Sequence, residues 1–196
     1  MPIDDAAPAR SRNAAATREA ILASARSAFA RAGYDGAGVR EIAAGAGVTA
    51  MLVNRYFGSK EQLFAEVVAA TMADPVILTD DFVRAPTGEA IARRLVGLSG
   101  ADQTPLDGFL VMFHSASSRR AAEISREQIE AIHQRAMASA LGGHLAAERA
   151  AVILAIVAGV QVMRQMIALP TLANADPEAL VAILAPVFQA LIDGVR

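Results

Sequence analysis

The residues that could do chemistry gather in one short stretch of this 196-residue chain, between Thr49 and Lys60. Asn54 and Arg55 are side chains that pair with base edges, Asn with adenine and Arg with guanine or a phosphate. Tyr56 can donate its hydroxyl to a phosphate, and Lys60 supplies a point charge for the same backbone. These residue types predict recognition of a nucleic acid rather than the making and breaking of bonds.

Two short helices joined by a tight turn must position these side chains. After a longer helix that ends at Gly33, the apolar spacing predicts a helix over residues 39–45 and a turn over 46–48. A second helix follows over 49–56, capped by Thr49. This is the pattern of a helix-turn-helix, whose second helix lies in the major groove of DNA. On periodicity alone, a generic helical hairpin with solvated polar residues explains it at least as well. The expected outward side carries Thr49, Ala50, Met51, Asn54 and Arg55.

The charge of the chain is unevenly distributed. The net charge is −2, which by itself argues against a nucleic-acid partner. Residues 10–64, however, hold eight basic and four acidic side chains, whereas residues 65–196 hold ten basic and fourteen acidic ones. A basic head on an acidic remainder suits a small DNA-binding domain attached to an unrelated body. Chance asymmetry explains the split equally well.

The composition excludes several kinds of site. The chain has no Cys, so disulfides, thiolate nucleophiles and Cys-zinc sites are ruled out. The three His residues, His114, His133 and His144, are scattered and predict no metal site, and we expect no cofactor. Paired acid and base, nucleophile elbow and phosphate loop are all missing. Ser115, Ser117 and Ser118 are the only faint candidates for a nucleophile, so we expect that the protein is not an enzyme.

The hydropathy pattern bears on location. The longest unbroken apolar run, Ala150 to Val160, has 11 residues. A membrane-spanning helix needs about 20. The N-terminal segment is acidic and lacks the apolar core of a secretory signal. We therefore expect a cytoplasmic protein with no membrane partner.

Helical periodicity recurs through the whole chain. Hydrophobic residues make up 54%, the mean hydropathy is +0.36, and Val and Ile fall at helical rather than alternating spacing. The sequence therefore predicts an all-α fold of about nine helices, three in a head, one linking and five in a body. We expect a flexible N-terminal arm over residues 1–13, a helix-turn-helix domain over 14–60, and a helical ligand-binding and dimerisation domain over 61–196.

Large apolar side chains and two histidines of the body are candidates for a ligand pocket. Met is a soft gap-filler common at adaptable sites, and a pocket of apolar groups with a few polar ones suits a small apolar ligand. For each of these residues, an ordinary place in the core is the more frequent use. The candidates are Phe82, Phe109, Met112, Phe113, His114, His133, Met137 and Met163.

The last two predicted helices, over residues 145–169 and 177–193, are too apolar for one-sided surface helices. Burial against a second copy, in a four-helix interface with two-fold symmetry, is the natural use. Burial within one protomer is the alternative. The candidate interface residues are Val152, Ile153, Ile156, Val160, Leu180, Ile183, Leu184, Val187, Phe188 and Leu191.

Ordered motifs over about residues 15–64 resemble those of the TetR (tetracycline-repressor-like) family of bacterial transcriptional regulators. They are Arg18-x-x-Ile21-Leu22-x-x-Ala25, Phe29-Ala30-x-x-Gly33-Tyr34, Val39-Arg40-Glu41-Ile42-Ala43, Ala46-Gly47-Val48-Thr49 and Tyr56-Phe57-Gly58-Ser59-Lys60-Glu61-x-Leu63-Phe64. Residues 140–188 look like one subgroup of the family's bodies, less distinctively. The resemblance implies a dimer whose third helix enters the major groove. The DNA-facing positions that it implies are Arg40, Thr49, Ala50, Met51, Asn54, Arg55, Tyr56 and Lys60.

Two positions depart from the family pattern. Position 54 is commonly Tyr and is Asn54 here, so the contact made there differs. Position 38 is commonly Thr or Ser, which caps the second helix and touches a phosphate, whereas Gly38 offers only a backbone N–H.

The resemblance implies a mechanism. A dimer binds double-stranded operator DNA and blocks transcription, and an apolar or amphipathic ligand in the body releases it. Two alternatives stay open: a DNA-binding regulator with no effector, whose body serves only dimerisation, and a helical enzyme.

Overall fold

The computed structural model describes residues 7–72, 80–100 and 107–194 of the chain. These residues form helices and no strand, which confirms the predicted all-α fold. The helical segments of this described part outnumber the nine expected. Two of them, α5 (Asp80–Arg84) and α11 (Pro170–Ala173), are shorter than the window over which helical periodicity is detected.

The described chain divides into two compact units. Unit 1 holds the described residues of 1–71 and 107–126, and unit 2 holds those of 72–106 and 127–196. This division differs from the expected boundary between residues 60 and 61. The difference arises because a helix from the middle of the chain packs against the first helix and completes unit 1.

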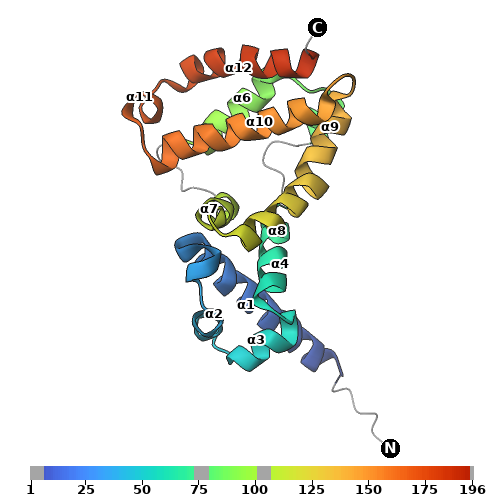
Figure 1. Ribbon diagram of the computed structural model, residues 1–196, viewed down its shortest axis with the longest axis vertical. Helices are drawn as coiled ribbons and strands as arrows, with labels where there is room; N and C mark the ends of the chain where they lie inside the picture. The colour runs from blue at the N-terminus through green and yellow to red at the C-terminus, as the bar shows by residue number, and fades with distance from the viewer. Residues whose placement is uncertain (1–6, 73–79, 101–106, 195–196) are drawn as a thin grey trace, which may run out of the picture. The chain divides into compact units, whose positions relative to one another are not determined.

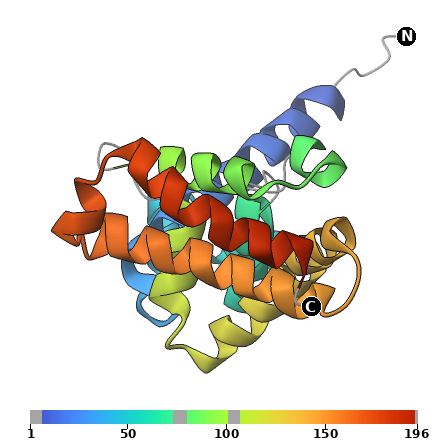
Figure 2. The ribbon, with the colours of Figure 1, turned by 90° about the horizontal axis from the view of Figure 1, so that it is seen from above.

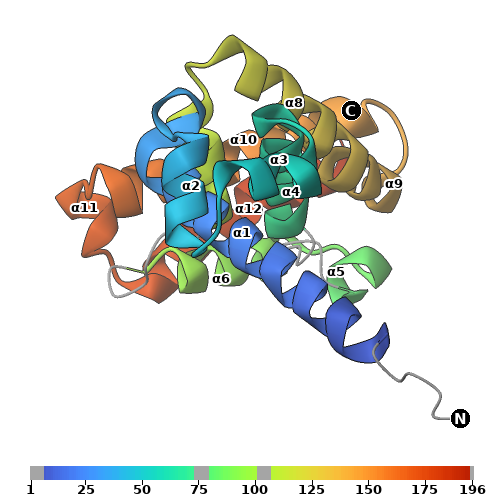
Figure 3. The ribbon, with the colours of Figure 1, turned by 90° about the horizontal axis from the view of Figure 1, so that it is seen from below.

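Unit 1 contains the expected head helices, which Figure 3 shows grouped together. The first begins at Ala7, so residues 7–13 of the expected flexible arm are helical, whereas residues 1–6 lie outside the described part. The helices are α1 (Ala7–Gly36), α2 (Val39–Gly45), α3 (Ala50–Phe57), α4 (Lys60–Met72), α7 (Asp107–Ser115) and most of α8 (Arg119–Ile129).

Three aromatic rings join α1 to α4 in unit 1. The Phe64 ring lies edge-on to both Phe29 and Tyr34, with centroids 5.1 Å apart in each pair. Phe29 and Tyr34 stack with centroids 6.2 Å apart. Edge-to-face aromatic pairs add stability beyond the area they bury. The cluster therefore fixes α4, which directly follows α3, against the long first helix.

Helix α7 approaches α1 at a point where only glycine fits. Gly33 has φ +67°, and a Cβ there would lie 2.3 Å from the His114 carbonyl oxygen. Around this contact, His114 Nδ1 donates to the Ala30 carbonyl at 2.5 Å, and the Tyr34 N–H donates to Ser115 Oγ at 2.9 Å. The sequence predicts that the first helix ends at Gly33; in the structure the non-helical backbone of Gly33 kinks α1, which continues to Gly36. The absence of a side chain at Gly33 also lets α7 pack closely against α1.

Unit 2 is built on three helices, α6 (Gly88–Leu98), α10 (Ala146–Gln161) and α12 (Pro177–Asp193). Helix α12 packs along both α6 and α10 (Figures 1 and 2). Gly88 permits the close approach, because a Cβ there would lie 2.2 Å from the Ala185 carbonyl oxygen. The Gly88 N–H also donates to Gln189 Oε1 at 2.8 Å. The largest buried side chains of this core are Phe82, Ile91, Leu95, Met137, Ile153 and Phe188.

Two π-helical turns interrupt the long helices of unit 2. The turn η1 (Glu130–Gln134) lies between α8 and α9 (Arg135–Leu141), and η2 (Val162–Met166) continues α10. Each inserts one residue relative to an α-helix and so rotates the side chains that follow it. Sequence periodicity assigned each of these stretches to one uninterrupted helix.

Arg149 is a buried arginine near the start of α10. It is 4% exposed, and all three nitrogens of its guanidinium group donate to carbonyl oxygens. Nε donates to His144 at 3.0 Å, Nη1 to Leu191 and Ile192 at 2.9 Å each, and Nη2 to Gly142. These carbonyls lie at the ends of α9 and α12, where a cation is favoured by the helix dipole.

The helical stretch Ala146–Met166, which is α10 together with η2, is long and apolar enough to cross a membrane by length and composition alone. This differs from the expectation drawn from the longest unbroken apolar run. Arg149 and Arg164 are buried near its two ends and donate to carbonyl groups elsewhere in unit 2. These contacts tie both ends of the stretch to other elements of unit 2.

Candidate nucleic-acid interface

Helices α2 and α3 form the predicted helix-turn-helix. Gly47 closes the turn with φ +67°, and the Val48 N–H donates back to the Ala43 carbonyl at 2.9 Å. Thr49 caps α3, as predicted, because its Oγ1 accepts the Leu52 N–H at 3.3 Å. The inward side of α3 is anchored by two buried side chains, Val53 and Phe57.

The outward side of α3 faces solvent. Met51 is 81% exposed and shares this side with the exposed Asn54 and Arg55. Of the eight residues predicted to face DNA, Arg40, Thr49, Met51, Asn54 and Arg55 are exposed, and Ala50, Tyr56 and Lys60 are half-buried.

The arginines of unit 1 fall into two groups. Arg18 pairs with Glu66 and Arg31 with Glu41. Within the described part of the chain, Arg40 and Arg55 form no ion pair. Their charges are therefore available to a phosphate or a guanine on the side that α3 presents.

Gly38 precedes α2 where the family commonly has Thr or Ser. Its backbone is extended, with φ −93° and ψ 140°, and no side chain caps the helix. A Cβ at Gly38 would meet nothing within 4 Å. The position is therefore free to accept a side chain, and its glycine is not required by packing.

Lys60 begins α4 and does not point freely into solvent. Its Nζ lies 4.6 Å from the centroid of the Tyr34 ring, which is a cation–π contact. Burial, followed by the nearby Glu61 carboxylate, raises the pKa of the Tyr34 hydroxyl, so the ring stays neutral beneath the ammonium group. To reach a phosphate, Lys60 must leave this ring.

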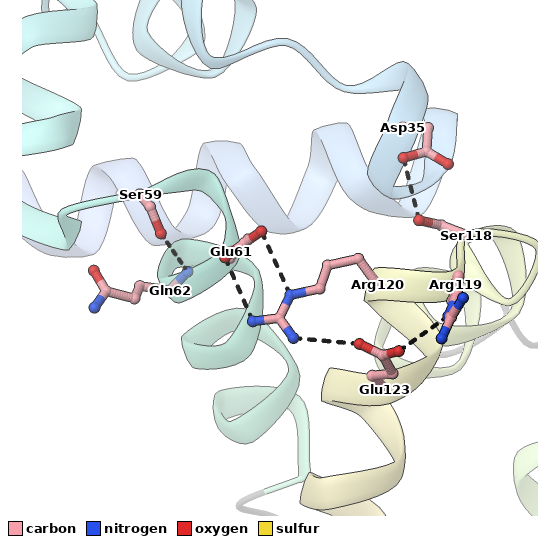
Figure 4. A network of polar contacts seen from close by, with 8 residues as sticks. All are labelled: Asp35, Ser59, Glu61, Gln62, Ser118, Arg119, Arg120 and Glu123. Atoms are coloured by element: carbon pink, nitrogen blue, oxygen red, sulfur yellow. Dashed lines mark hydrogen bonds and ion pairs between the residues drawn. The ribbon is translucent and has the colours of Figure 1, made fainter.

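A polar network fixes the start of α4, immediately after α3 (Figure 4). Arg120, at the start of α8, reaches Glu61 on α4 at 3.4 Å and Glu123 on its own helix at 3.3 Å. Ser118 Oγ donates to Asp35 at 3.1 Å and so ties the same turn to the end of α1. Sequence reasoning missed this network because Glu61 and Arg120 are 59 residues apart.

The eight candidate ligand residues are distributed between the two units. Phe109, Met112, Phe113 and His114 belong to α7 of unit 1, whereas Phe82, His133, Met137 and Met163 belong to unit 2. Phe82 and Met137 are buried in the unit 2 core, and Phe113 is 44% exposed. His133 lies half-buried on η1, where burial lowers the pKa of its imidazole. The candidates stay a prediction.

The ten candidate interface residues divide by exposure. Ile153, Leu180 and Phe188 are buried in the core of unit 2, so their own protomer already covers them. Val152, Ile183 and Val187 are exposed, with Ile183 at 64%. The remaining four, Ile156, Val160, Leu184 and Leu191, are half-buried.

A helix-turn-helix with an exposed polar side, carried by an all-α chain, defines the helix-turn-helix class of DNA-binding proteins. Residues 21–67 match the family described as bacterial regulatory proteins, tetR family. Residues 85–192 match the tetracyclin repressor-like C-terminal domain. The chain belongs to the TetR family of transcriptional regulators, whose members bind DNA. None of the curated proteins matches it.

Solved structures support the family over nearly the whole chain. A TetR-family regulator from Streptomyces coelicolor is 25% identical with TM-score 0.53, covering 92% of this chain and 96% of its own. A transcriptional regulator from a Rhodococcus species is 28% identical with TM-score 0.58, covering 87% and 93%. The fatty acid degradation regulator from Bacillus halodurans shares the fold at 20% identity and TM-score 0.59, covering 91% and 99%.

Proposed function

We propose that the protein is a homodimeric, sequence-specific repressor that works in the bacterial cytoplasm and leaves its operator when a small molecule binds. The observation that carries the proposal is the outward side of α3. There, exposed Asn54 and Arg55 stand beside Met51, whose apolar side chain suits contact with thymine methyl groups. Arg40, on the preceding helix, suits a phosphate.

The exposed apolar side of α10 and α12 supports the homodimer. Val152 on α10 and Ile183 and Val187 on α12 are apolar side chains left in solvent on two helices that pack together (Figure 2). A second copy related by two-fold symmetry would cover the same residues on both protomers. To bind two half-sites of one operator, the two recognition helices of such a dimer must lie about 34–36 Å apart, which is one turn of DNA.

A small apolar or amphipathic molecule would release the operator by shifting the dimer toward a conformation that does not bind DNA. The dimer has one conformation whose recognition helices match the operator and another whose helices do not. The ligand must bind the second conformation more tightly than the first. The regulator with no effector differs from this account only in that no small molecule changes its affinity for DNA.

Fluorescence anisotropy with labelled DNA from upstream of the protein's own gene tests the proposal. We expect saturable, salt-sensitive binding that bulk DNA does not compete away. Arg55→Ala should weaken it at least about fivefold, since one bidentate arginine contact is worth about 1–3 kcal/mol. Arg135→Ala removes the same charge from an exposed position on α9 and should leave the affinity nearly unchanged.

If the upstream DNA does not bind, a selection from genomic fragments replaces it, because the operator can lie elsewhere. Failure to enrich any fragment, or equal losses for Arg55→Ala and Arg135→Ala, would contradict the proposal.

The homodimer has its own test, light scattering behind size exclusion. Ile183→Asp places a charge in the proposed interface and should yield monomers. Val83→Asp makes the same kind of change at an apolar residue on α5 that is 50% exposed, and should leave the dimer intact. A monomeric wild-type protein at micromolar concentration would refute the dimer.

A further inference from the structure

Unit 2 has an open groove of about 490 Å³, lined by α6, η2, α11 and the start of α12. All of these elements belong to unit 2. None of the eight predicted ligand residues lines it. Its walls combine small apolar residues, among them Val96, Gly97 and Val181, with two arginines, Arg93 and Arg164. A volume of this size suits a small organic molecule.

Arg164 is the polar group at the base of this groove. It is 3% exposed, and its guanidinium group is held from two sides. Nε donates to the Leu172 carbonyl at 3.1 Å, and Nη1 donates to the Val96 carbonyl at 2.9 Å and to Ser99 Oγ at 2.8 Å. The third nitrogen, Nη2, has no acceptor within the described residues. The arginine is therefore rigidly placed, with one edge unused.

Arg149 and Arg164 differ in how many of their donors the fold uses. Both are buried, and both donate to carbonyl oxygens near helix ends. Arg149 uses all three nitrogens, including Nη2 toward Gly142, and lines no part of the groove. Arg164 lines the groove and leaves Nη2 open. Capping of helix ends explains all the contacts of Arg149. It does not explain why Nη2 of Arg164 has no acceptor within the described residues.

The charge of Arg164 has no carboxylate against it within the described residues. Burial lowers the pKa of its guanidinium group, which still stays protonated, so the chain carries a positive charge in a poorly solvated place. Such a charge is most stable when an anion pairs with it and accepts its remaining N–H groups. The groove gives an anion access to it.

The π-helical turn η2 is what directs Arg164 there. An α-helix continued through residues 162–166 would place the side chain at a different angle, and π turns of this kind recur at functional sites. We infer that the groove binds a small monocarboxylate with an apolar body, whose carboxylate pairs with Nη2 of Arg164 and whose body lies along Val96, Gly97 and Val181.

Charged residues at the mouth of the groove affect which anions it accepts. Arg93 is held there between Glu89 at 2.9 Å and Glu178 at 2.8 Å, and Glu178 also lines the groove. Two carboxylates, Glu89 and Glu178, share the one Arg93 at this mouth, so the local balance is negative and disfavours a second negative charge on the ligand. Removing the charge of Glu178 should strengthen binding.

Isothermal titration calorimetry of the full chain tests the inference with three probes that share one apolar body. They are 4-phenylbutanoate, 4-phenylbutan-1-ol and 4-phenylbutylamine, which are an anion, a neutral molecule and a cation at pH 7.5. We expect the carboxylate to bind at least tenfold more tightly than the alcohol, and the amine not to bind. Equal affinities for the three, or no heat from millimolar carboxylate, would overturn the inference.

Variants locate the site without disturbing Arg164. Gly97→Leu fills the groove, because a Cβ at Gly97 meets nothing within 4 Å and its φ is ordinary. It should weaken carboxylate binding at least tenfold. Ala90→Leu adds the same side chain at an exposed position of the same helix outside the groove, and should have no effect. Equal effects of the two changes would place the binding elsewhere and overturn the inference.

Two charge variants complete the test. Arg164→Gln should abolish the preference for the carboxylate over the alcohol, with folding checked by circular dichroism, and Glu178→Gln should tighten carboxylate binding severalfold. An unchanged preference in folded Arg164→Gln would overturn the inference.

The inference deepens the ligand-responsive part of the proposed function and rests on it only for an effect at DNA. Calorimetry contains no DNA, so failure of operator binding leaves the calorimetric result intact, and failure of carboxylate binding leaves operator binding intact.

Discussion

Arg55 in unit 1 and Arg149 in unit 2 are the same residue type in opposite surroundings. Arg55 is exposed on a short helix and makes no ion pair within the described residues, whereas Arg149 is 4% exposed and donates to four carbonyl groups. The difference separates two uses of a cation. In unit 1 the guanidinium group is exposed and, in the proposed function, contacts DNA, whereas in unit 2 it holds helix ends together.

The two units also reach stability by different contacts. Unit 1 relies on the aromatic cluster of Phe29, Tyr34 and Phe64 and on the backbone approach at Gly33. Unit 2 relies on a mostly aliphatic core that also contains Phe82 and Phe188, and on buried arginines. Exposed cations contribute little to stability, so evolution can change the recognition side without unfolding the chain. Variants can therefore separate folding from recognition.

The largest expected effect is that of Arg149→Ala. The change leaves four carbonyl groups without their donor and empties the space of a buried side chain, so we expect a loss of about 2–5 kcal/mol in the free energy of unfolding. Urea unfolding followed by circular dichroism measures it. Arg135→Ala, at an exposed position, should leave the unfolding curve in place. Similar unfolding curves for the two variants would contradict the claim that Arg149 stabilises the fold and that an exposed arginine does not.

Gly33→Ala comes next and tests unit 1. The new Cβ must accept φ +67° and a 2.3 Å approach to the His114 carbonyl oxygen, so the helices must separate. We expect a loss of about 2–3 kcal/mol in the free energy of unfolding. Gly38→Ala is the control, because its φ is −93° and its Cβ meets nothing. A harmless Gly33→Ala would mean that α7 does not depend on this approach.

A smaller effect is expected from pH, through His133 of unit 2. Burial lowers the pKa of its imidazole below the ordinary 6.5, so the unfolded chain binds the proton more tightly. Stability should therefore fall as the pH drops from 7 through 6.5 and below, by less than about 1 kcal/mol because the ring is only half-buried. His133→Gln should flatten this part of the stability profile. An equally steep profile in the variant would assign the loss to other groups.

The smallest expected effect is that of Gly38→Ser in unit 1. The hydroxyl can cap α2, and we expect a gain of a few tenths of a kcal/mol in the free energy of unfolding. The same hydroxyl restores the phosphate contact that the family commonly makes, so operator affinity should also rise. Thermal unfolding and anisotropy measure the two effects, with Gly38→Ala as the control without a hydroxyl. An affinity equal to that of Gly38→Ala would exclude a phosphate contact at this position.

The head could be predicted from the sequence because its determinants are local. The Thr49 cap, the turn at Gly47 and the buried Val53 and Phe57 all act within a few residues of one another. Motif and periodicity therefore agree with the structure there.

The remainder depends on contacts between distant residues, which no local pattern records. His114 reaches Ala30 across 84 residues, and Arg164 reaches Val96 across 68. The first contact brings α7 into unit 1, and the second fixes the base of the groove. The π turns are invisible for a further reason, since one inserted residue barely alters the apolar spacing.

The measurement that tests the central claim most directly is a hydroxyl-radical footprint of the wild-type protein on the DNA that it selects from genomic fragments. The account predicts two protected patches related by two-fold symmetry, about one helical turn or 34–36 Å apart, both lost in Arg55→Ala. A single protected patch, or protection that persists in Arg55→Ala, would contradict recognition by the paired α3 helices of a dimer.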